Sequence, residues 1–130
     1  MQRTHKEKDT MSLDTYKILT KQQWEKAQKI GCIKTPIDEK DGFIHLSTAA
    51  QLATTLSFFF EDYETLLLLE LKKNEFKEAL VFELPFPEDH RSGRFPHLYS
   101  ELKVSQISKV WEIKRGAFSL PKELLLKAER

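Results

Sequence analysis

The sequence predicts a single α+β domain with two main helices and a mixed or antiparallel sheet, and three observations support this prediction. The chain has 130 residues, of which 40% are apolar and 32% charged, and such a chain can bury a substantial core. Segments with the two-residue alternation of strands are interspersed with two segments that have the helical spacing of apolar residues. There is no internal repeat or linker, so we expect residues 13–130 to form one domain.

The first 31 residues are expected to hold a tail, a strand and a helix. Residues 1–12 are almost wholly polar, and we expect a disordered tail because they cannot bury enough surface to offset the entropy of ordering. Apolar and β-branched residues predict a first strand over 15–19. Thr20 and Gln23 have the spacing of a capping box, which predicts a helix that ends at Gly31.

A second strand and a second helix are predicted after a turn-rich loop that extends to Gly42. Ile44 and Leu46 alternate with their neighbours, which is typical of a half-buried strand. Thr48 and Gln51 repeat the capping-box spacing, and apolar residues then recur at steps of three and four. We therefore expect a second helix that ends near residue 61 and presents a broad apolar face to the core.

Strands and one long loop account for most of the second half of the sequence. Residues 66–71 form an apolar run broken only by one glutamate, which suits a central strand buried on both faces. Alternation predicts another strand over 80–84, and residues 85–96 have the composition of a long loop. Residues 107–114 are expected to form the last strand, followed by a short leucine-rich helix from about residue 119.

Composition and charge narrow the classes of function. No apolar run approaches the ~20 residues of a membrane-spanning helix, and the N-terminus lacks the apolar core of a secretory signal. The single cysteine, Cys32, cannot form an internal disulfide, so we expect a cytoplasmic protein. The 21 basic and 20 acidic residues nearly cancel, which gives no support to nucleic acid binding. Nothing in the sequence indicates the oligomeric state.

The run over residues 42–48 contains a candidate site. If the apolar residues of this strand point into the core, the two-residue period places Phe43, His45 and Ser47 together on the opposite face. A titratable ring and a hydroxyl would then share one surface. The structural alternative is that His45 bonds to a nearby carbonyl and that Ser47 or Thr48 only caps the next helix.

A second candidate site follows the long loop. Pro96 restrains Phe95 to an extended conformation, and alternation then places Phe95, His97 and Tyr99 on one side, with Glu101 at the same parity. Two aromatic rings beside an imidazole suit a planar heteroaromatic ligand, so a small, nucleotide-like molecule is the expected partner. The structural alternative is an aromatic cluster that closes the loop over the sheet.

Two further charged residues, Lys17 and Glu83, have to be placed relative to this cleft, and the sequence lacks the patterns of a metal site and of a phosphate-binding loop. Lys17 is opposite in parity to its apolar neighbours and could enter the same cleft to bind an anion; alternatively it is an edge-strand lysine that discourages aggregation. Glu83 interrupts an apolar strand, and we expect it to face solvent rather than the cleft. The four histidines lack the spacing of metal ligands, and no glycine-rich phosphate loop is present, so neither kind of site is predicted.

Taken together, these motifs resemble the bacterial family called domain of unknown function 952. The resemblance covers roughly residues 15–113 and rests on GFIHLST with a following glutamine, FPHLY, and an opening YKI with a tryptophan and a glycine after it. This sequence departs from the family at Ser100 and Glu101, where the family's run usually reads FPHLYGPL. It also has Lys17 where many relatives have a histidine.

The resemblance implies a fold similar to that of ADP-ribosyltransferases, in which a split α+β sheet binds NAD without a Rossmann domain. Lys17, His45 and residues 97–101 match the positions of the three functional motifs in that superfamily. The implied chemistry is cleavage of the nicotinamide glycosidic bond through an oxocarbenium-like state, which makes NAD a candidate substrate. The candidate catalytic residues are His45 and His97, and the candidate ligand-binding residues are Lys17, Phe43, Ser47, Thr48, Phe95, Tyr99 and Glu101.

Three functions therefore compete at this stage. The first is an enzyme of ADP-ribosyl or nucleotide-glycosyl transfer, in which the two histidines bind the substrate or move protons. The second is a non-catalytic binder of a nucleotide-like metabolite or a modified residue, which uses the same surface without transfer. The third is a structural domain in which both motifs only pack. A single concave pocket that contains both histidines would favour the first two.

Overall fold

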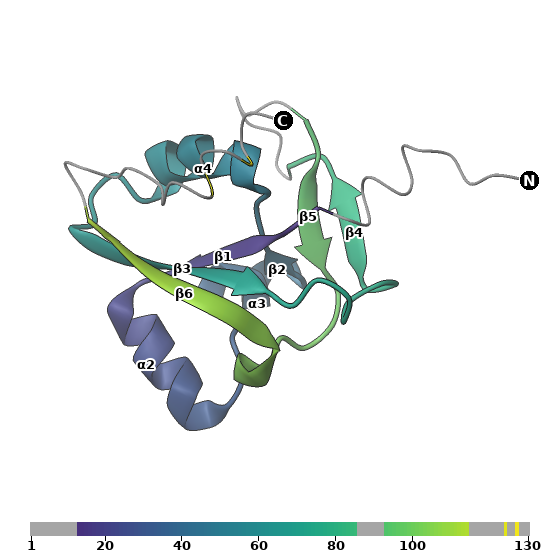
Figure 1. Cartoon of the computed structure of the whole chain (residues 1–130), viewed down its shortest axis with the longest axis horizontal. Helices are drawn as coiled ribbons and strands as arrows, with labels where there is room; N and C mark the ends of the chain where they lie inside the picture. Colours follow the sequence, from purple (N-terminus) through teal and green to yellow (C-terminus); the bar gives the residue numbers. More distant parts are fainter. Residues whose placement is uncertain (1–12, 86–92, 115–123, 125–126, 128–130) are drawn as a thin grey trace, which may run out of the picture.

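The computed structural model describes residues 13–85, 93–114, Leu124 and Lys127, and two three-stranded antiparallel sheets dominate the fold (Figure 1). The α+β class predicted from the sequence is confirmed. The elements in chain order are β1 (Tyr16–Leu19), α2 (Lys21–Ile30), α3 (Pro36–Asp41), β2 (Ile44–His45), the 3-10 turn η1 (Ala49–Gln51), α4 (Leu52–Phe59), β3 (Thr65–Leu71), β4 (Leu80–Glu83), β5 (Phe95–Leu98), the 3-10 turn η2 (Val104–Gln106) and β6 (Ile107–Lys114).

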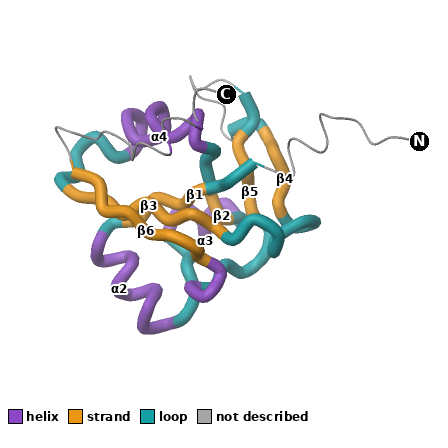
Figure 2. Tube along the Cα trace, viewed as in Figure 1, coloured by secondary structure: helices purple, strands orange, loops and turns teal. Residues whose placement is uncertain are grey.

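The first sheet has the strand order β1-β3-β6, so the apolar run of β3 forms the central strand, as predicted. Successive side chains of a strand point to opposite faces, and β3 therefore supplies two separate apolar clusters. Leu67 and Leu69 pack in the cluster that α2 covers, whereas Leu66 and Leu68 pack in the cluster that α4 covers. Figure 2 shows these two helices on opposite faces of the sheet.

The second sheet has the strand order β2-β5-β4 and is joined to the first at its β2 end. In the antiparallel pair of β2 and β5, His45 lies directly opposite His97. Just after β2, the Ser47 N–H donates to the Tyr16 carbonyl at 3.0 Å, and the Tyr16 N–H donates to the Ser47 carbonyl at 2.8 Å. This isolated bridge fixes the start of β1 against the end of the histidine motif.

Capping residues set the ends of the two main helices. At the start of α2, the Gln23 N–H donates to Thr20 Oγ1 and the Thr20 N–H donates to Gln23 Oε1, which confirms the predicted capping box. Gly31 ends this helix in the left-handed conformation with φ of 96°. At the other helix the Thr48 N–H donates to Gln51 Oε1, and α4 ends at Phe59, two residues before the predicted end.

The segment before Gly42 is a helix and not the turn-rich loop expected from the sequence. Thr35 Oγ1 accepts from the Asp38 N–H, and Asp38 Oδ2 accepts from the Thr35 N–H, so these two residues form a third capping box. Pro36 occupies the first helical position, and Gly42 ends the helix with φ of 85°. The helix α3 has six residues, which is too short for an apolar period to become visible in the sequence.

Other expectations differ at segment ends or fall outside the described residues. Phe95 and Pro96 belong to β5 and not to the preceding loop. The tail over 1–12, most of the long loop and most of the C-terminal helix lie outside the described residues. No helix in the part of the chain that is described has the length and apolar character needed to cross a bilayer.

Near the C-terminus, Leu124 and Lys127 contact the first sheet. Leu124 is fully buried in the apolar cluster that α4 covers. The Lys127 ammonium donates to the Asp14 carboxylate, to Glu70 Oε2 at 3.2 Å and to the Tyr16 hydroxyl at 3.3 Å. Burial raises the pKa of Tyr16 well above its ordinary value, although the hydrogen bond from Lys127 opposes that shift.

Replacing Leu68 by alanine should lower the free energy of unfolding by about 2 to 5 kcal/mol, because this fully buried side chain leaves a cavity in the central strand. Urea denaturation of the purified protein measures the change. The matched control is Lys26→Ala on the exposed face of α2, which should alter stability by less than about 0.5 kcal/mol. Equal losses in the two variants would contradict the central position of β3.

Candidate functional site

A cavity of about 760 Å³ opens where the two sheets meet. Its described walls come from β1, α3, the segment around β2, α4 and β5. This volume lies within the range of pockets that hold small organic ligands. His45 and His97 both line it, so the two histidine motifs contribute to one concave site although 52 residues separate them in the chain.

An aromatic group joins the two histidines. His45 and His97 face each other across the β2–β5 pair with ring centroids 5.8 Å apart. The Phe43 ring stacks on His97 at 4.0 Å with an interplanar angle of 22°, and its centroid lies 4.6 Å from that of His45. Phe43 lies just before β2, two residues from His45, and His97 is opposite His45 on β5, so the three side chains emerge on the same face.

Two carboxylates of α3 hold the His45 ring. His45 Nδ1 lies 2.7 Å from Asp38 Oδ1, and Nε2 lies 2.9 Å from Asp41 Oδ2. The backbone N–H of His45 also donates to Asp38 Oδ1 at 3.0 Å. The left-handed turn at Gly42 brings β2 back beside the helix, which places the strand within reach of both carboxylates. The ring orientation is therefore fixed by a local helix–turn–strand unit.

Asp38 connects that unit to β1. Its carboxylate is fully buried, with Lys17 Nζ 3.0 Å from Oδ1 and 2.8 Å from Oδ2. Lys17 also donates to the His45 carbonyl at 3.0 Å. Burial alone would raise the pKa of Asp38, but the hydrogen bond from His45 and the Lys17 ammonium outweigh burial and hold that pKa well below its ordinary value. Burial lowers the pKa of Lys17, an effect that Asp38 opposes.

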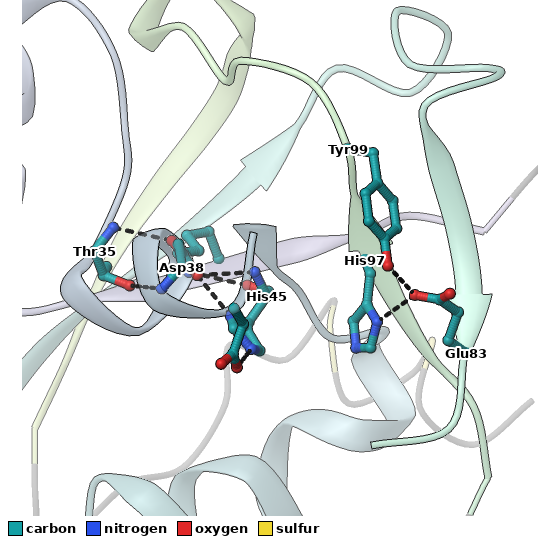
Figure 3. Close-up of polar contacts among 8 residues, drawn as sticks. Thr35, Asp38, His45, Glu83, His97 and Tyr99 are labelled. Carbon is teal, nitrogen blue, oxygen red and sulfur yellow. Dashed lines mark hydrogen bonds and ion pairs between the residues drawn. The ribbon is translucent and has the colours of Figure 1, made fainter. Parts of the chain in front are cut away.

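A third carboxylate, Glu83 of β4, orients the His97 side of the site (Figure 3). His97 Nδ1 lies 2.8 Å from Glu83 Oε1, and the Tyr99 hydroxyl donates to the same oxygen at 2.7 Å. The Tyr99 and His97 hydrogen bonds lower the pKa of Glu83, and the Glu83 carboxylate raises the pKa of Tyr99. Glu83 was expected to face solvent. Its side chain is 39% exposed, but its carboxylate also contacts His97 and Tyr99.

The structure brings together most of the candidate residues named from the sequence. Those that line the cavity are Lys17, Phe43, His45, Ser47, Phe95 and His97. Tyr99 is not among the described lining residues, but its ring lies 5.4 Å from that of Phe43. Thr48 and Glu101 are also outside the lining: Thr48 precedes the η1 turn, and Glu101 is exposed beyond β5.

Several residues of the site were not identified from the sequence. Asp38 and Asp41 fall in the segment taken for a loop, although the Thr35-Pro36 pair before Asp38 has the pattern of a helix start. Thr55 of α4 lines the cavity, and its hydroxyl lies 3.0 Å from that of Ser47. The described residues include no group of three or more histidine, cysteine and acidic side chains placed to hold a metal ion.

The comparisons with known proteins agree with this architecture. The model of a family described as "Protein of unknown function (DUF952)" matches residues 18–110. The chain belongs to this family. The match includes both histidine motifs, Asp38 and Glu83, and it begins one residue after Lys17.

A solved protein of similar sequence and fold is protein CC0527 from Caulobacter crescentus. Its crystal structure is 31% identical with a TM-score of 0.73, and the match covers 86% of this chain and 98% of that one. Its solution NMR structure is 32% identical with a TM-score of 0.68, over 84% of this chain and 91% of that one. Among curated proteins, none matches this chain significantly.

The lowered pKa of Asp38 should make stability depend on acid pH. The folded state holds this carboxyl ionised, so its contribution is complete above the unfolded pKa of about 4 and is lost as the pH falls from there toward the lower folded pKa. The free energy of unfolding should therefore decrease below about pH 4. Carbon-detected NMR titration of the Asp38 carboxyl measures its folded pKa directly; a value at or above about 4 would contradict the expectation.

Asp38→Asn should lower stability at neutral pH by about 3 to 5 kcal/mol, because it leaves the buried Lys17 ammonium without its counterion. It should also flatten the dependence on acid pH. The matched control is Asp62→Asn, at an exposed position after α4, which should change stability by less than about 0.5 kcal/mol.

Proposed function

We propose that this protein binds a small, nucleotide-like molecule by its heteroaromatic ring in the cavity between the two sheets. The observation that carries the proposal is the cross-strand pair of His45 and His97 in one cavity with the Phe43 ring against both. A structural role for the two motifs would not require a cavity beside them. Aromatic faces with a few placed polar groups are typical of pockets for planar ligands.

Different residues of this pocket would stack on the ligand ring and form hydrogen bonds with it. Phe43 and the buried Phe95 line the pocket, Phe43 is the more accessible ring, and stacking a base on an aromatic side chain contributes about 1 to 3 kcal/mol. The Ser47–Thr55 hydroxyl pair offers donors and acceptors to the polar edge of the ligand ring, whereas both ring nitrogens of His45 are already engaged by Asp38 and Asp41. Carboxylates already hold both imidazole rings in one orientation. Ligand binding therefore costs little side-chain conformational entropy at these two residues.

Replacing Phe43 by leucine should weaken binding of the ring about 5- to 150-fold, because leucine preserves apolar contact but removes the stacking face. Ligand-detected NMR and ligand-induced shifts in Tm, with nucleobases, nucleosides and nucleotides, measure the effect. The matched control is Phe82→Leu, since Phe82 is not among the described residues that line the cavity. If no compound of this class stabilises the parent protein, the proposed function is wrong.

A second candidate function is transfer at the glycosidic bond of the same ligand, and the paired histidine–carboxylate contacts favour it. Both imidazoles have Nδ1 on a carboxylate, which is how proteins orient a histidine for proton transfer; His45 Nε2 contacts the Asp41 carboxylate as well, so a ligand must displace Asp41 before His45 exchanges a proton. In such a reaction the bond from the ring nitrogen to the anomeric carbon breaks, and the base leaves with the electron pair. The base of an uncharged nucleoside takes a proton from one histidine, whereas the nicotinamide of NAD leaves as a neutral pyridine and needs none. The other histidine takes the proton of the attacking water or hydroxyl. The resemblance to ADP-ribosyltransferases makes NAD one substrate to test.

If transfer occurs, His45→Gln and His97→Gln should each lower kcat by about 100- to 10,000-fold, because glutamine keeps a hydrogen-bonding group but cannot exchange protons near neutral pH. Chromatographic detection of the released base measures the rate. Ligand binding, assayed in parallel, should persist in at least one of the variants. Unchanged rates in both would leave binding as the function.

A further inference from the structure

The lysine inside the cavity wall has no capacity left to bind a phosphate. Lys17 is 4% exposed, and its Nζ lies within 3.0 Å of both Asp38 carboxylate oxygens and of the His45 carbonyl. An ammonium has three donors, so these three oxygens use all of them. Turning Lys17 toward a ligand would leave a buried carboxylate without its counterion, which is strongly unfavourable. The anion that Lys17 binds is therefore the Asp38 carboxylate and not a ligand.

The charges around the histidines are mainly negative. Asp38 and Asp41 stand against His45, and Glu83 stands against His97, so carboxylates flank the site on both sides. Among the described residues that line the cavity, Lys40 is the only cation besides Lys17, and it is exposed to solvent, where screening weakens it. A phosphate placed next to the two imidazoles would meet repulsion from the Asp41 and Glu83 carboxylates, whereas Lys17 already neutralises Asp38.

The described outer wall of the cavity is mainly apolar, with Lys40 as its charged exception. Ile37 of α3 and the α4 residues Phe58 and Phe59 all line the cavity, and they are 49%, 43% and 52% exposed. Side chains that belong to the cavity and also meet solvent mark its mouth. Apolar groups cannot replace the hydration of a phosphate, so a charged group held at this mouth would lose free energy. An uncharged ring or aliphatic group would instead cover these side chains.

Resting on the function proposed above, we infer that the ligand is a nucleobase or nucleoside without phosphate, and that the Ile37, Phe58 and Phe59 side chains accept an uncharged apolar substituent on it. The base lies beside Phe43, His45 and His97 at the inner end of the cavity, with its polar edge toward the Ser47–Thr55 hydroxyl pair. The substituent lies at the mouth between α3 and α4. Nucleotides and dinucleotides such as NAD are weaker ligands than the corresponding nucleosides.

Paired compounds test this inference on the full chain. Isothermal titration and ligand-detected NMR should compare adenosine, guanosine and uridine with their monophosphates and with NAD. At least one nucleoside should bind about tenfold or more tightly than its monophosphate, and raising the salt concentration should not weaken it. A monophosphate or NAD that binds as tightly as the nucleoside, with affinity that falls with salt, overturns the inference and leaves the proposed function standing. If neither kind of compound binds, both are overturned.

Two variants locate the determinants. Phe59→Ser should weaken binding of an adenosine that carries a benzyl group on its exocyclic amine about fivefold more than binding of adenosine itself. Tyr63→Ser is the matched control, because Tyr63 is an exposed aromatic residue that is not among the described lining residues. Lys40→Gln should leave the ratio of adenosine to AMP affinity unchanged. A selective loss of AMP binding in this variant would show that the mouth recognises phosphate and would overturn the inference.

Discussion

The Asp38 carboxylate lies at the point where three segments of the chain meet, and the cavity depends on it. It accepts hydrogen bonds from the Lys17 ammonium of β1, from the Thr35 N–H just before α3 and from the His45 N–H of β2. It also lies within hydrogen-bonding distance of the His45 ring nitrogen Nδ1. A fully buried charge is tolerable only when its hydrogen-bonding capacity is used, and here each partner comes from a different element. The same contacts that stabilise the charge set the position of the His45 imidazole.

The two sheets make complementary contributions to the site. The α3–β2 unit fixes His45 from one side, and Glu83 of β4 fixes His97 from the other, while the Tyr16–Ser47 bridge holds the first sheet against the second. Both imidazoles belong to the second sheet, and β1 of the first sheet closes the cavity beside them, so the concave surface needs both sheets. A small ligand bound between them would therefore meet side chains whose orientation is set before it arrives, which reduces the entropic cost of binding.

Local features of the sequence predicted much of the fold, and their limits are physical. Capping boxes and the apolar run of β3 depend on neighbouring residues alone, so they were visible without a structure. Strand parity correctly placed Phe43 and His45 on the cavity face. The partnership of Lys17 and Asp38 joins residues 21 positions apart in sequence, and no local pattern indicates which carboxylate a buried lysine will meet. Glu83 is partly exposed, as expected, but its contacts with His97 and Tyr99 could not be foreseen for the same reason, because these partners lie in and just after the paired strand β5.

The contact between Lys127 and Asp14 has a consequence for the chain's connectivity. These residues lie near the two ends of the described chain, yet their side chains form an ion pair beside Tyr16 and Glu70. A domain whose ends meet in space tolerates circular permutation, because a short linker can join the old ends while new ones open in an exposed turn. A permutant of this kind could carry a fused reporter close to the cavity while the Asp38 framework stays within one uninterrupted segment.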